Sequence, residues 1–70
     1  MKNLPAGTTV RINRRFTILD GLTGIVKRHR DVGSVDRLFT VETVVRGEKR
    51  EEYLWDFEVV EYGLSIPATA

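Results

Sequence analysis

Two short runs of basic residues give this chain its clearest capacity to bind a ligand. Lys27-Arg28-His29-Arg30 is the denser run, and Arg14-Arg15 is the second. If the strands that carry them pair, both runs lie at one end of the hairpin or on its outer face, where they would track a phosphate backbone. Such binding weakens steeply as salt rises. The alternative is a solvated hairpin end, neutralised by nearby acids, or a surface for a protein partner. The predicted nucleic-acid-binding residues are Arg14, Arg15, Lys27, Arg28 and Arg30.

Large aromatic side chains near these charges could serve the same ligand. Exposed rings beside basic groups stack nucleic-acid bases, at about 1–3 kcal/mol each, and in a small barrel they also line grooves for extended peptides. Tyr53 and Trp55 stand among charged residues at the start of a turn, so the sequence does not favour an exposed over a buried position for either ring. For Phe16 and Phe57 we expect burial in a small core. The predicted aromatic or partner-binding residues are Phe16, Tyr53 and Trp55.

The chain lacks the sets of residues that catalysis or metal binding requires. It has no cysteine and one histidine, His29, which lies between two arginines and has no evident partner as a general base. No helix is expected after Gly21-x-x-Gly24, so these glycines do not form a phosphate loop. The carboxylates of residues 48–61 alternate with apolar residues, which puts most of them on a wet face. We expect no enzyme activity, no catalytic residue, no metal and no cofactor.

The formal net charge of +1 conceals an uneven distribution of charge along the chain. Residues 1–35 carry seven Lys or Arg against two acids, a balance of +5, and residues 36–70 carry four against eight, a balance of −4. This asymmetry indicates one basic face and one acidic face. The alternative is that folding mixes the two halves over a small surface.

Strand and turn signals alternate along the chain, and no stretch keeps a helical period. Alternating apolar and polar residues with turn residues every 8–12 positions favour an all-β fold. Gly24, inside the second strand, indicates a bend or a bulge. The expected strands span residues 8–13, 22–29, 37–45, 49–54 and 58–62, with a 3₁₀ turn in residues 55–58 before the last strand.

Five short strands are too few for a sandwich of normal size. They can close into a small, strongly bent barrel, which also removes exposed edges. The core of such a barrel is thin for a domain without disulfides, so we expect modest stability, and a homodimer would help. The expected core residues are Val10, Ile12, Phe16, Leu22, Ile25 or Val26, Phe39, Val41, Leu54, Phe57 and Val59.

Seventy residues, 41% of them hydrophobic and 30% charged, predict one small globular domain. We assign residues 1–62 to this domain and residues 63–70, which carry no charge and no pattern, to a flexible tail. No apolar run approaches the roughly 18–20 residues that span a bilayer, and residues 1–5 lack the core of a signal peptide. We expect a cytoplasmic protein without a membrane partner.

The order of these signals resembles that of an SH3-like barrel, and the first two strands resemble a KOW motif. The residues that carry the resemblance are Gly7-x-x-Val10-x-Ile12 and Gly21-x-x-Gly24-x-Val26, and Tyr53 to Val60 resemble the 3₁₀ turn and closing strand of many such barrels. Arg14-Arg15 stand where the KOW motif often has a glycine, in a longer connection. The resemblance implies a five-stranded SH3-like barrel and a binding module that contacts RNA or DNA, or protein.

Two hypotheses of function follow. The first is a small non-catalytic protein that docks RNA or DNA phosphates on the basic face of the barrel. The second is a protein-interaction module, such as an accessory factor of a bacterium or of a phage or plasmid, which modulates a larger host protein through its acidic and aromatic face. The strand rhythm is also similar to that of very small plasmid-borne dihydrofolate reductases, but the sequence contains no matching active-site motif.

Overall fold

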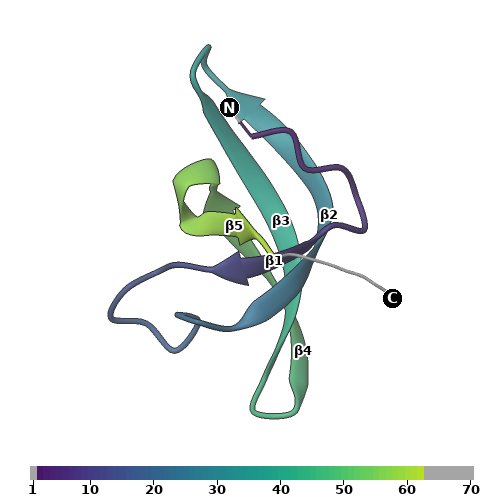
Figure 1. The fold of residues 1–70 in the computed structure, drawn as a ribbon, viewed down its shortest axis with the longest axis vertical. Coiled ribbons are helices and arrows are strands. Elements are labelled where there is room, and N and C mark those ends of the chain that lie inside the picture. Colours follow the sequence, from purple (N-terminus) through teal and green to yellow (C-terminus); the bar gives the residue numbers. More distant parts are fainter. Residues whose placement is uncertain (1, 63–70) are drawn as a thin grey trace.

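The computed structural model describes residues 2–62, and these residues form an all-β fold (Figure 1). One 3₁₀ helix, η1, precedes the last strand, as the sequence predicted. The predicted tail, residues 63–70, lies outside the described residues. The elements are β1 (Thr9–Ile12), β2 (Thr23–Val32), β3 (Asp36–Val45), β4 (Glu48–Trp55), η1 (Asp56–Glu58) and β5 (Val59–Glu61).

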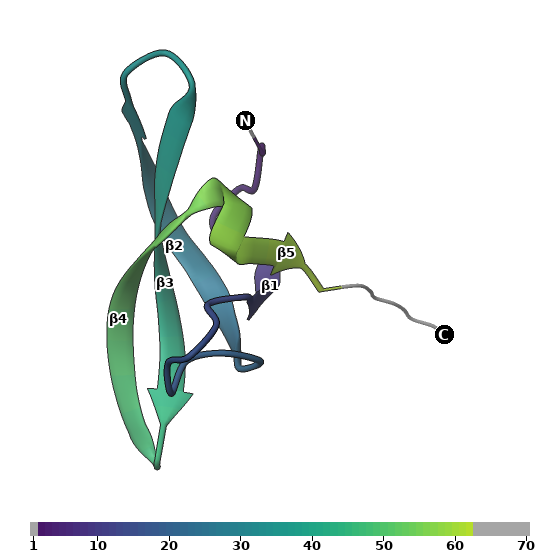
Figure 2. The same ribbon diagram turned by 90° about the vertical axis from the view of Figure 1, so that its left-hand side faces the viewer.

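The five strands form one antiparallel sheet in the order β4-β3-β2-β1-β5. Figure 2 shows β1, η1 and β5 together on one side of the long β2–β3 pair. Within residues 2–62 no backbone ladder joins β4 to β5, so the sheet is bent but open, and the expectation that closure would remove both edges is wrong. Lys49, Arg50 and Glu51 are exposed on β4, and charged side chains on an edge strand disfavour pairing with a foreign strand.

Two features of β2, a close-packed glycine and a bulge, accompany its pairing with β1 at its first residues and with β3 along most of its length. Its first residues pair with β1, and Gly24 there packs so closely on β3 that an added Cβ would lie 2.5 Å from Val41 Cγ1 and 2.7 Å from the Glu42 carbonyl oxygen. The bulge predicted at this glycine lies instead at Lys27, where the β2–β3 register shifts between Val26 and Arg28. Gly24 is therefore a close-packing residue, and Lys27 is the extra residue of a bulge.

The core contains most of the expected residues and three that were not expected. Leu4, Leu19 and Val45 are buried, and Leu22 packs against the cluster. Leu4 reaches the core because the N-terminal segment folds over it, which the sequence pattern of the strands did not show. The buried apolar residues are Leu4, Val10, Ile12, Leu19, Val26, Phe39, Val41, Val45, Leu54 and Val59.

Phe16 and Phe57 were expected in the core, and this expectation is wrong. Phe16 is 100% exposed and Phe57 is 67% exposed. Phe16 lies in the connection between β1 and β2 with φ of 65°, a left-handed backbone conformation. In this loop it is Leu19 that turns inward and fills the space over the core.

The N-terminal segment is tied to η1 and β5 by polar contacts. Lys2 Nζ donates to the carbonyl oxygens of Asp56 and Val59, at 2.7 and 2.6 Å. Arg37 Nη1 donates to the carbonyl oxygen of Lys2 at 2.9 Å. These bonds hold Leu4 over the core, and we call residues 2–4 the N-terminal strap.

Replacing Gly24 with alanine should destabilise the protein. The new methyl group would overlap the Glu42 backbone, which cannot move without disturbing β3, and overpacking of this kind costs roughly 1–3 kcal/mol. Urea unfolding measures the effect. Gly33→Asn is the matched control, because a Cβ there meets nothing within 4 Å and asparagine tolerates the φ of 67°. Equal stability of Gly24→Ala and the wild type would contradict the close approach.

Replacing Phe16 with asparagine should raise the free energy of unfolding by about 1 kcal/mol, because asparagine tolerates a left-handed backbone better than phenylalanine does. Urea unfolding of dilute protein measures it. If the ring of Phe16 were buried, the same substitution would lower the free energy of unfolding, since removal of a phenylalanine ring from a core costs about 3–5 kcal/mol.

The Asp31–Arg37 pair predicts a pH effect. Arg37 Nη2 donates to Asp31 Oδ2 at 3.1 Å and its Nε to Oδ1, and these hydrogen bonds hold the pKa of Asp31 below its usual value of 3.8. Their contribution to stability is complete above pH 3.8 and is lost as the pH falls through the lowered pKa. Arg37→Gln should raise the pKa of Asp31 toward 3.8, as measured by NMR titration of its carboxyl group. An unchanged pKa would contradict the pairing.

Candidate nucleic-acid interface

The bulge at Lys27 decides which side chains of β2 face outward. Before it, Gly24 and Val26 face the core; after it, His29 stands opposite Phe39, with ring centroids 6.0 Å apart. Arg28 and Arg30 consequently lie on the outer face of the sheet, because residues on a strand alternate between its faces.

Neighbouring strands complete this outer face. In the register, Arg28 stands beside Thr40, which stands beside Tyr53, and in the next row Arg30 and Leu38 stand beside one another. These residues surround a groove of about 430 Å³. We call it the basic groove; its lining residues are Arg28, His29, Arg30, Leu38, Thr40 and Tyr53.

The cations of the basic groove are available to a ligand. Arg28 Nη2 lies 3.3 Å from Glu51 Oε1, but both side chains are largely exposed. An exposed pair of this kind contributes only about 0–1 kcal/mol, so a phosphate can replace the carboxylate at little cost. Arg30 makes no ion pair within residues 2–62, and its guanidinium is exposed.

The two aromatic residues of β4 have different surroundings. Tyr53 is 59% exposed on the groove, with Arg28 and Thr40 in its row. Trp55 is half-buried beside Leu38, and its backbone N–H donates to Glu58 Oε1 at 3.0 Å. Tyr53 can therefore offer a face to a base, whereas Trp55 is partly covered.

The second basic run lies away from the first. β1 pairs with β2 only through Thr23 to Ile25, so the loop that carries Arg14 and Arg15 lies beyond one end of this pairing and Lys27 to Arg30 beyond the other. The expectation that both runs meet at one end of the hairpin is wrong. It failed because β2 extends well past β1.

Arg14 is also committed to the fold. Its Nε lies 3.2 Å from Glu58 Oε2, and its backbone N–H donates to Asp20 Oδ1 at 3.0 Å. The Glu58 side chain is only 12% exposed, and its backbone oxygen accepts from the Asn13 N–H at 2.7 Å. Arg14 thus joins the β1–β2 loop to η1, whereas Arg15 is exposed and makes no ion pair within the described residues.

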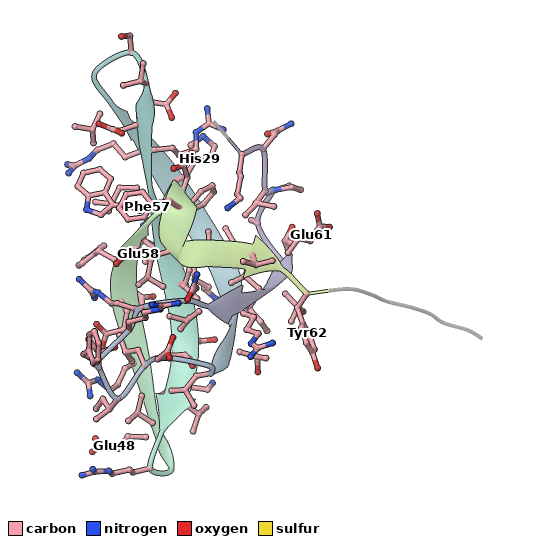
Figure 3. All side chains as sticks on the ribbon, turned by 60° about the vertical axis from the view of Figure 1, so that its left-hand side comes forward. His29, Glu48, Phe57, Glu58, Glu61 and Tyr62 are labelled. Atoms are coloured by element: carbon pink, nitrogen blue, oxygen red, sulfur yellow. The ribbon has the colours of Figure 1, made fainter. Side chains whose placement is uncertain are left out.

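The acidic side chains form no second site of this kind. In Figure 3 Glu48 lies at the hairpin end of β4, whereas Glu58 and Glu61 lie at η1 and β5. Residues 2–62 contain no group of three or more potential metal ligands. Nor is any helix in this part of the chain suited by length and apolarity to cross a bilayer.

Sequence reasoning missed Leu38 and Thr40 as groove residues. Both were assigned only to a strand, and their place beside the arginines depends on the bulge, which the sequence does not mark. Comparison with models of protein families, with curated proteins and with solved structures finds no match for this chain.

Proposed function

We propose that this protein is a non-catalytic module that binds single-stranded nucleic acid in the basic groove. The observation that carries the proposal is the convergence of Arg28, Arg30 and Tyr53, two cations and an exposed ring, on one groove of about 430 Å³. Cations that track phosphates beside a stacking ring are typical of single-strand binding.

We further propose that the fold is an SH3-like barrel with a KOW-like beginning, left open between β4 and β5. The order of the strands and the η1 turn before β5 support this assignment. Two glycines of the proposed motif bond across the first pair of strands: Gly7 N–H donates to the Val26 oxygen and Gly21 N–H to the Ile12 oxygen, both at 2.8 Å. A fold of this kind hosts many functions, so the groove, and not the fold, carries the functional argument.

The proposed mechanism has two steps with different chemistry. Arg28 and Arg30, two residues apart on one face of β2, dock on the phosphates of an extended strand, and Lys27 at the bulge adds a third nearby charge. Tyr53 then stacks a base that a duplex would keep inside its own stack. Single strands should therefore bind more tightly than duplex DNA at equal salt.

Fluorescence anisotropy with labelled single-stranded RNA, single-stranded DNA and duplex DNA tests the proposal, at about 50 and 200 mM salt. We expect affinity for single strands to fall with salt, and Arg28→Ala/Arg30→Ala to lower both the affinity and the salt slope. Tyr53→Ala should reduce the affinity for single strands by roughly fivefold or more, with little change in the salt slope.

Arg11→Ala/Arg15→Ala is the matched control for charge, because it removes two exposed cations that lie outside the basic groove and make no ion pair within residues 2–62. Equal losses in the two double variants would contradict docking in the basic groove. An absence of binding at low salt to all three nucleic acids would overturn the proposal, and the protein-interaction hypothesis would then take its place.

A further inference from the structure

Many large apolar side chains of this protein lie on its surface. Within residues 2–62, ten large hydrophobic side chains are exposed, and the buried core also contains ten. Scattered exposed apolar residues are ordinary, but grouped ones mark surfaces that a partner covers. Two of the exposed groups are a loop that carries an aromatic side chain and a groove with apolar walls.

The first group is a projecting loop between β1 and β2, in which Phe16 is fully exposed and Ile18 is 56% exposed. The loop is rigid. Thr17 Oγ1 donates to the Arg14 oxygen at 2.7 Å, and Asp20 N–H donates to the Thr17 oxygen at 3.2 Å. Phe16 is thus held in a strained left-handed conformation with its ring in solvent, and such preorganised aromatic residues are effective anchors in interfaces.

The second group lines a groove of about 570 Å³ on the outer face of β2 and β3. Ile25 and Val44 are 44% and 54% exposed there, and Leu22 is half-buried. Pockets that hold organic ligands have volumes of roughly 300–1,000 Å³, so a phenyl ring fits. We call this the apolar groove; its lining residues are Thr9, Leu22, Thr23, Gly24, Ile25, Glu42, Thr43, Val44 and Lys49.

The apolar groove is separate from the basic groove. The two grooves share no lining residue and follow one another along the outer face of β2 and β3, the apolar groove toward Glu48 and the basic groove toward His29 (Figure 3). The apolar groove is also adjacent to the loop, since Leu22 and Thr23 follow it directly in the chain. When a projection and a groove lie next to each other on one surface, two copies related by a twofold axis can each place the projection in the groove of the other.

We propose that two copies of this chain form a symmetric dimer in which Phe16 of each copy enters the apolar groove of the other. Charge complementarity supports a second copy as the occupant. Apart from Arg14, whose guanidinium is paired with Glu58, the loop carries one cation and one anion, Arg15 and Asp20, and the groove likewise carries Lys49 and Glu42. The dimer would cover four of the ten exposed apolar side chains: Phe16, Ile18, Ile25 and Val44.

Sedimentation equilibrium from micromolar to submillimolar protein tests this dimer. We expect a monomer–dimer equilibrium that Phe16→Asn and Val44→Lys each weaken by at least about tenfold, the effect of losing an interface anchor. Val35→Lys is the matched control, because Val35 is 73% exposed but lies in the β2–β3 turn. Urea unfolding of each variant shows that it is folded.

A mixture of the Phe16→Asn and Val44→Lys variants provides the sharper test. Each heterodimer would retain one intact contact, the Phe16 ring of the Val44→Lys chain in the unaltered groove of the other, so it should be more stable than either variant homodimer. A monomeric wild type over the whole range, an open-ended series of larger species, or a mixture no more associated than its parts would overturn the proposal.

Discussion

One additional residue in β2 determines what both faces of the long strands can do. Because Lys27 has no partner of its own on β3, the alternation of side chains shifts by one position there. Without the shift, Arg28 would stand opposite Phe39, and Arg28 and Arg30 would both lie on the core face. Their guanidinium groups would then be buried at a large desolvation cost, or they would keep the core from forming. With it, the strand contributes valine to the core before the bulge and arginine to the outer surface after it.

The small core is supplemented by polar contacts at the places where the sheet stays open. Lys2 bonds to the carbonyl oxygens of η1 and β5, and Glu58 links the β1–β2 loop to the turn before β5. Both sets of contacts lie around η1, which joins β4 to β5 where no ladder does. Ammonium, guanidinium and carboxylate groups thus connect the segments around η1 where the sheet has no backbone ladder.

Much of the fold was predictable because its signals are local. The Arg46–Gly47 turn, with both φ values positive, and the 3₁₀ turn at residues 56–58 are encoded by adjacent residues. The fate of the β1–β2 loop was not predictable in this way, since Phe16 and Leu19 are equally apolar and only the path of the backbone decides between them. The basic groove was half predicted: its arginines and Tyr53 were identified, but their convergence depends on the register of three strands.

The N-terminal strap has a consequence for the order in which this chain can fold. Lys2 and Val59, which it joins, are 57 residues apart, whereas β2, β3 and β4 are linked by short turns. Contacts between distant residues form late, because the loop between them must be closed first. During synthesis the β2–β3–β4 meander can assemble as it emerges from the ribosome, and β1 can pair with β2 at the same stage. The strap has to wait for η1 and β5. Residues 2–4 therefore precede these strands in the chain but take their place after them, and a chaperone would meet an incompletely covered core until then.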